Sequence, residues 1–182
     1  QSFGSIFRAM IDAGVMTIMS GHIALPSYVR ARYPNSGRDA YTPAAVSRLL
    51  NQDLLRDELG FRGLIVSDAT VMGGLTSWMD RAAAVPAVIE NGCDVFLFSR
   101  EPRADMDHML RGLREGRLSE QRLEEAVTRI LSLKAALGLH RAAPEDRLPP
   151  LDALKARLSD DDHRQSARQA AGKSITLVKD AQ

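Results

Sequence analysis

The run Gly60–Asp68, Gly-Phe-Arg-Gly-Leu-Ile-Val-Ser-Asp, constrains the fold of this chain more than any other segment. Its centre, Leu64 to Val66, is apolar without polar alternation, which predicts a short strand buried on both faces. Strands of this kind belong to parallel sheets that are covered by helices. Asp68 follows at the end of the run, where catalytic and binding groups stand in parallel α/β folds. The segment therefore predicts an α/β fold with a carboxylate at the carboxyl end of one strand.

The remaining pattern alternates apolar runs with helical periodicity. Further strands are predicted at 15–20, 94–99 and 174–178, in addition to 63–67. Helices are predicted at 43–59, 80–91, 103–115, 119–137 and 160–171. This order is typical of βα units with a parallel sheet and right-handed crossovers. Because three strands cannot close a barrel, the pattern fits either a small doubly wound domain or one part of a larger (β/α)₈ barrel.

Composition excludes several classes of protein. The 182 residues carry 24 basic and 23 acidic side chains, a net charge of +1 that argues against a nucleic-acid or anionic-membrane surface. No apolar run approaches the roughly 18 residues that span a bilayer. The single cysteine, Cys93, excludes an internal disulfide and a cysteine-cluster metal site, and its apolar surroundings predict a small buried core residue. No metal-ligand spacing or phosphate-binding glycine motif is present, so no metal and no cofactor is expected.

Four blocks of the sequence, in this order and spacing, resemble glycoside hydrolase family 3. They are Val15–Ile23, Thr42–Ser47, Leu55–Asp68, and Arg129–Lys134 followed by Gly138-Leu139. The resemblance implies that residues 1–140 are the C-terminal part of a TIM-barrel glycosidase domain, about the last three βα units of a (β/α)₈ barrel. Residues 166–179 resemble the entry to the family's second domain, an α/β sandwich. Residues 159–182 are then its incomplete start, and the proline-rich segment within 141–158 is a linker.

The resemblance also implies an activity. Asp68 stands at the position of the family's nucleophile, in enzymes that hydrolyse β-linked sugars with retention of configuration. The run Ser67–Gly74 is nearer to the β-N-acetylhexosaminidase-like branch, because many β-glucosidases have tryptophan where this chain has Ala69. The implied substrate is a carbohydrate with a terminal β-linked N-acetylglucosamine or related hexosamine. A β-glucosidase or β-xylosidase of the same family is the nearest alternative, and a non-catalytic carbohydrate-binding or scaffold module is an alternative of another class.

The other catalytic group of the family, a histidine on a Lys-His-Phe-Pro-Gly type of loop, has no match in this sequence. It is expected upstream of Gln1, in a parent protein that also holds the missing N-terminal barrel half and the remainder of the second domain. The chain alone is therefore expected to be inactive. The cellular compartment stays open.

Physical chemistry supports Asp68 as a nucleophile, since attack on an anomeric carbon needs an ionised and rigidly held carboxylate. An aspartate in this place is also common as a turn or helix N-cap residue. His22 follows the first predicted strand and Met72 follows Asp68 by four residues. Both are candidates for substrate binding, and structural packing explains each equally well. Weaker candidates are Arg100 after the strand predicted at 94–99, Trp78 in a loop, and Arg38 and Asp39 on the long loop between Gly21 and Thr42.

Overall fold

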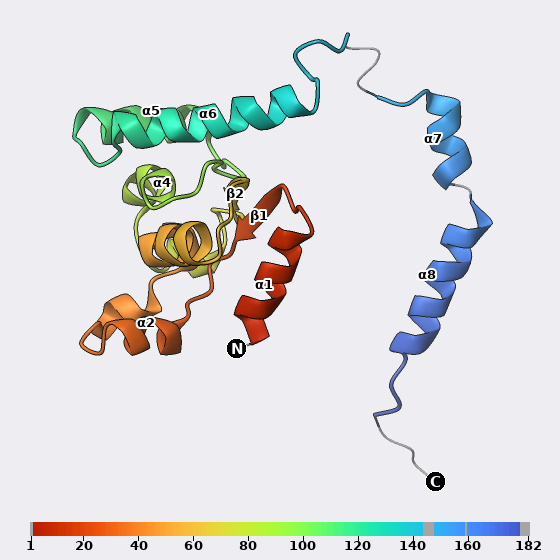
Figure 1. Ribbon diagram of the computed structural model, residues 1–182, viewed down its shortest axis with the longest axis horizontal. Coiled ribbons are helices and arrows are strands. Elements are labelled where there is room, and N and C mark those ends of the chain that lie inside the picture. The colour runs from red at the N-terminus through yellow and green to blue at the C-terminus, as the bar shows by residue number, and fades with distance from the viewer. Residues whose placement is uncertain (1, 144–147, 159, 179–182) are drawn as a thin grey trace. The chain divides into compact units, whose positions relative to one another are not determined.

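The computed structural model describes residues 2–143, 148–158 and 160–178. The chain divides into two compact units, Gln1–Leu137 and Gly138–Gln182 (Figure 1). The first unit contains the sheet and the apolar core. The second unit contains two helices.

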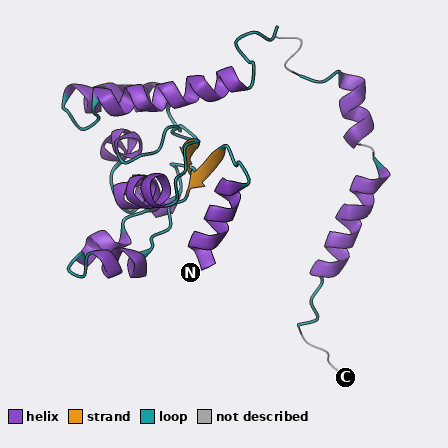
Figure 2. Ribbon diagram, in the orientation of Figure 1, coloured by secondary structure: helices purple, strands orange, loops and turns teal. Residues whose placement is uncertain are grey.

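Two parallel strands form the sheet of the first unit, as Figure 2 shows in orange. Strand β1 spans Thr17–Ser20 and β2 spans Leu64–Ser67, with Ser20 paired to Ser67 at their carboxyl ends. Both strands lie inside predicted runs, so these two predictions are confirmed. In β2, Ile65 and Ser67 on one face are fully buried, while on the other face Leu64 is buried and Val66 is partly exposed. The unit is therefore a mixed α/β fold.

The third predicted strand, 94–99, is wrong as a strand. It contributes one parallel bridge, between Val66 and Val95. Side-chain oxygens take the places of the next ladder bonds on both sides of that bridge. Asp94 Oδ2 accepts from the backbone N–H of Ile65 at 3.0 Å, and Ser67 Oγ accepts from that of Leu97 at 2.9 Å. The sheet of the described residues therefore has two regular strands and a third segment held beside them.

Six α-helices lie in the described part of the first unit. They are α1 Ser2–Asp12, α2 Pro26–Arg32, α3 Gly73–Thr76, α4 Arg81–Glu90, α5 Pro102–Arg114 and α6 Glu120–Ala136. The predicted helices 80–91, 103–115 and 119–137 are confirmed as α4, α5 and α6. Asp80 and Ser119 cap two of them, accepting from Ala83 N and Arg122 N. The pattern missed α1 and α2.

The segment 43–59 is helical but not one α-helix. It contains the 3₁₀ turn η2, Ala44–Val46, and the π-helix η3, Leu49–Glu58, after a further 3₁₀ turn η1, Gly37–Tyr41. Thr42 is the C-cap residue of η1 and does not cap the start of a helix. Thr42 and Pro43 are both extended, since a residue before proline is driven out of the helical region. Gly60 follows η3 with a φ of 74°, the left-handed conformation expected there.

The apolar core lies between the sheet and the helices. Ile65, Phe61, Val88 and Leu118 are almost completely buried in it, and α4 packs against η2, α5 and α6. Cys93 is fully buried, as predicted, and burial raises the pKa of its thiol to about 12. This cysteine is therefore a protonated core residue at neutral pH.

The second unit holds α7, Leu151–Leu158, and α8, Asp161–Ser174. Helix α8 covers the predicted helix 160–171, whereas α7 forms within the segment expected to be a linker. The predicted strand 174–178 is wrong: Ser174 ends α8, and Ile175 and Val178 are 82% and 93% exposed. A strand needs a partner, and no described residue pairs with this segment. Residues 144–147, 159 and 179–182, which the linker and second-domain predictions include, lie outside the described residues.

Candidate active site

The carboxyl ends of β1 and β2 form one edge of the sheet, and Asp68 is the first residue beyond it. Its backbone N–H donates to Ser20 O at 3.0 Å, which continues the ladder past the last strand pair. Its carboxylate is half-buried, and Oδ1 accepts from Ala69 N at 2.7 Å.

The carbonyl of Ala69, the residue after Asp68, accepts hydrogen bonds from both other candidate residues, His22 and Met72. His22 Nε2 lies 3.0 Å from Ala69 O, and the backbone N–H of Met72 donates to the same oxygen at 3.0 Å. Because a carbonyl oxygen only accepts, Nε2 carries the proton of this bond. Nδ1 of His22 is buried without a hydrogen-bond partner among the described residues. The structure thus brings His22, Asp68 and Met72 to one edge, with the Met72 side chain 47% exposed.

Gly74 completes the contact between the two loops. A Cβ at this position would lie 2.8 Å from His22 Cβ and 3.2 Å from His22 O. The loop after β2 therefore lies directly on the loop after β1, at an approach that only glycine allows.

A buried threonine ties the same loop to the third segment. Thr70 Oγ1 lies 3.0 Å from Leu97 O and 3.1 Å from Phe98 O, so its single proton is shared between the two carbonyls. Thr70 is 1% exposed. The backbone around Asp68 is consequently fixed from both neighbours, β1 on one side and residues 97–98 on the other.

Arg81 and Asp105 form an ion pair that contacts the loop after β2 at Thr70. Arg81 donates to Asp105 Oδ1 through Nε at 2.6 Å and to Oδ2 through NH2 at 2.5 Å, and its NH1 reaches Thr70 O at 3.4 Å. Ser99 also donates to Asp105. Burial by itself raises the pKa of Asp105, but the hydrogen bonds from Arg81 and Ser99 outweigh it, so the pKa lies below its usual value.

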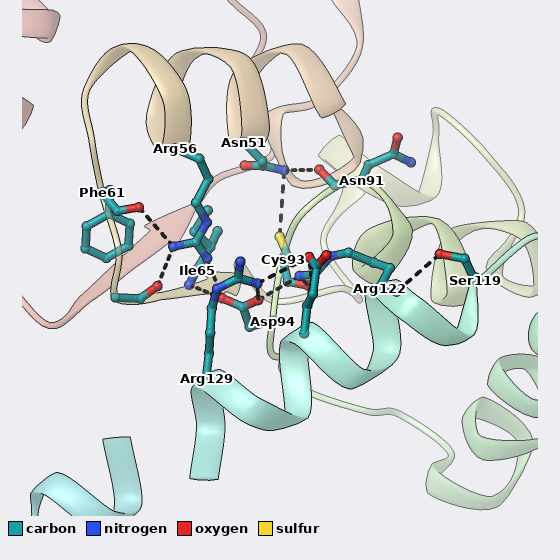
Figure 3. A network of polar contacts seen from close by, with 12 residues as sticks. Asn51, Arg56, Phe61, Ile65, Asn91, Cys93, Asp94, Ser119, Arg122 and Arg129 are labelled. Carbon is teal, nitrogen blue, oxygen red and sulfur yellow. Dashed lines mark hydrogen bonds and ion pairs between the residues drawn. The ribbon is translucent and has the colours of Figure 1, made fainter. Parts of the chain in front are cut away.

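A second charged cluster lies toward the opposite end of the strands (Figure 3). The fully buried carboxylate of Asp94 meets Arg56 NH2 at 2.6 Å, Arg122 NH2 at 2.7 Å and Arg129 NH1 at 3.2 Å. It accepts from Ile65 N, in the first half of β2, whereas Asp68 follows the last residue of that strand. Burial lowers the pKa of Arg56, against the opposing effect of Asp94. In parallel α/β folds, functional residues typically stand at the carboxyl ends of the strands and stabilising residues at the amino ends.

Sequence reasoning missed Asp94, its arginines and Thr70. Arg56 and Arg122 stand among apolar residues in segments with a clear buried face, Leu55 beside the former and Leu123 beside the latter. An arginine in such a position signals a buried partner, but the pattern does not say which carboxylate supplies it.

The weaker candidates have other environments. Arg38 lies 4.4 Å above the Trp78 ring and contacts Trp78 O at 3.4 Å, so these two residues bind each other. A cavity of about 680 Å³ is lined by residues between 29 and 49, Asp39 among them, and includes none of His22, Asp68 and Met72. Within the described ranges, no group of three His, Cys, Asp or Glu side chains could hold a metal ion. Nor does any described helix have the length and apolar character to cross a membrane.

Comparison with known proteins agrees with this arrangement. Residues 1–133 match the model of the glycosyl hydrolase family 3 N-terminal domain. The chain belongs to glycosyl hydrolase family 3. A β-N-acetylglucosaminidase/β-glucosidase of Cellulomonas fimi is 51% identical over 180 residues, which is 99% of this chain and 31% of that protein. The β-hexosaminidase A of Pseudoalteromonas piscicida is 28% identical and matches 89% of this chain and 28% of its own length.

Two solved structures share the fold of this chain. The β-glucoside phosphorylase BglX superposes with a TM-score of 0.86 at 40% identity, over 99% of this chain and 32% of its own. A family 3 β-N-acetylglucosaminidase from Paenibacillus superposes with a TM-score of 0.64 at 28% identity, over 75% of this chain and 25% of its own. The family 3 chain described here thus spans about a third of the length of these relatives or less.

Proposed function

We propose that this chain supplies the nucleophile of a retaining glycosidase that acts on terminal β-linked N-acetylglucosamine or a related hexosamine. In this proposal residues 1–140 are the last three βα units of a (β/α)₈ barrel, 141–158 a connection, and 159–182 the start of an α/β sandwich. The observation that carries it is the partly buried carboxylate of Asp68, placed one residue beyond β2, with Oδ1 accepting from Ala69 N. The hexosaminidase names of several relatives support the substrate class.

The proposed reaction at Asp68 has two steps, formation and breakdown of a covalent glycosyl-enzyme. A carboxylate oxygen bonds to the anomeric carbon as the glycosidic C–O bond breaks, and the leaving oxygen takes a proton from an acid on another part of the protein. An acceptor then bonds to the same carbon and gives its proton to the base that the acid of the first step has become, while the bond between that carbon and Asp68 breaks. His22 supports the nucleophile in this scheme by donating from Nε2 to the neighbouring carbonyl.

The acceptor separates two candidate reactions. Water gives hydrolysis and a free sugar, whereas inorganic phosphate gives a sugar 1-phosphate. Phosphate is a second candidate because a structure 40% identical over 99% of this chain is named a phosphorylase. Analysis of the product with and without phosphate distinguishes the two, and aryl N-acetylglucosaminide, glucoside and xyloside substrates rank the sugars.

The test of the proposal is the Asp68→Ala variant of the full-length protein that contains this chain. Turnover of an aryl N-acetylglucosaminide should fall by about 10⁴-fold or more, since nothing replaces the attacking group. Asp57→Ala, at an exposed aspartate of η3, is the matched control and should turn over normally. Equal turnover of the Asp68→Ala variant and the control would contradict the proposal. The 182-residue chain by itself should be inactive, because its partner acid lies elsewhere.

A further inference from the structure

Phe98 has an unusual backbone conformation. Its φ is +54°, and among the described residues it is the one non-glycine residue with a positive φ. Aromatic side chains rarely adopt this region, and such strain concentrates at binding and catalytic sites. The conformation therefore needs an explanation in terms of what the ring does.

The strained backbone is held by the residues that flank Asp68. Ser67 Oγ accepts from Leu97 N at 2.9 Å, and Thr70 Oγ1 lies within hydrogen-bond distance of Leu97 O and Phe98 O. Ser67 immediately precedes the proposed nucleophile and Thr70 follows it by two residues. The segment Ser67–Thr70 thus carries Asp68 and also holds the backbone of Phe98.

The position of Phe98 follows from the parallel bridge between Val66 and Val95. Beyond that bridge, Thr70 Oγ1, two residues past Asp68, lies 3.1 Å from Phe98 O. Phe98 is 66% exposed, whereas Phe96, two residues earlier, packs against the core. Packing within the described residues therefore does not account for the strain.

We propose that Phe98 is a substrate-contacting residue, whose ring meets the apolar face of the sugar bound at Asp68. The C–H groups on a pyranose face are weakly positive, and the face of an aromatic ring is negative, so the two surfaces attract as well as exclude water. The hydroxyls of Ser67 and Thr70 hold the backbone of Leu97 and Phe98 that carries the ring. This inference rests on the proposed function, because it assigns Phe98 to the sugar site of the same nucleophile.

The test compares Phe98→Gly with Phe98→Tyr in the full-length protein, using an aryl N-acetylglucosaminide. Glycine removes the ring and also relieves the positive φ, so the melting temperature should stay level or rise. KM should increase about fivefold with little change in kcat, as expected when a contact made equally in the ground and transition states is lost. Phe98→Tyr keeps the ring and should restore KM. Met106→Ala, at a 60% exposed residue of α5, is the control and should change neither quantity.

Three results would overturn the inference. An unchanged KM in Phe98→Gly would show that the ring does not touch substrate. A lowered melting temperature would show that the ring packs against another part of the protein, a structural role that glycine cannot keep. An active Asp68→Ala variant would remove the proposed function and this inference together. An inactive Asp68→Ala with a normal KM in Phe98→Gly removes this inference alone.

Discussion

His22 donates through Nε2 to the carbonyl of Ala69, the residue next to Asp68, over 3.0 Å. The bond joins the loop after β1 to the loop after β2 at the edge where the proposed nucleophile stands. Loss of such a positioning contact allows the attacking oxygen to shift, and a misplacement of about 1 Å can cost about 100-fold in rate.

We expect His22→Ala to lower kcat/KM by roughly 10- to 100-fold while protein stability changes less. His22→Gln can still donate to the carbonyl and should keep more of the activity. Steady-state kinetics of both variants, with melting temperatures measured in parallel, make the comparison. Full activity of His22→Ala would show that the hydrogen bond does not position Asp68.

The glycine pair after Met72 gives a matched test of the same contact. A Cβ at Gly74 would press on His22, whereas a Cβ at Gly73 meets nothing within 4 Å. Gly74→Ala should therefore destabilise the protein by about 1–3 kcal/mol and reduce activity, because the loops must separate. Gly73→Ala should be neutral or slightly stabilising, since alanine favours the helix. Equal denaturation midpoints of the two variants would contradict the close approach.

The Asp94 cluster predicts a large effect on stability. Asp94→Asn removes the one carboxylate that meets Arg56, Arg122 and Arg129, and its own side chain is fully buried. A buried charge left without its partner costs about 3–5 kcal/mol in the free energy of unfolding. Glu115→Gln, which breaks an exposed ion pair with Arg117, should cost less than about 1 kcal/mol. Urea unfolding of both variants checks the difference, and similar midpoints would refute the structural role of Asp94.

The pH dependence of stability has a predicted direction. The pKa of Asp105 is lowered in the fold, so its ionised form stabilises the protein above the unfolded pKa of about 4. That contribution is lost as the pH falls through the lower, folded pKa. Asp105→Asn should therefore be less stable than the wild type at pH 6 and should lose less stability on acidification. Denaturation midpoints between pH 6 and 2.5 test this, and parallel curves for the two proteins would contradict it.

Local sequence signals predicted the elements that depend on local chemistry. The apolar run before Asp68 predicted β2, and the helical patterns at 80–91 and 119–137 predicted α4 and α6, which the structure confirms. The pattern also placed Asp68 and His22 after strand ends, and both stand there. Their catalytic roles stay predictions.

The errors arise where distant side chains decide the backbone. The run 94–99 has a strand's composition, but Asp94 and the hydroxyl of Ser67 occupy positions that ladder bonds need. No local pattern reveals that substitution. Likewise, Ile175 and Val178 have strand-forming character, yet a strand forms only with a partner, which the described residues do not supply.

The most direct test of the account is covalent trapping of the glycosyl-enzyme. A 2-fluoro sugar with a good leaving group slows release of the intermediate, so peptide mapping of the full-length protein can locate the bound sugar. We predict that the label is on Asp68, in the peptide that contains β2. A label on any other residue, or complete inactivation without a label on this peptide, would contradict the assignment of Asp68 as the nucleophile.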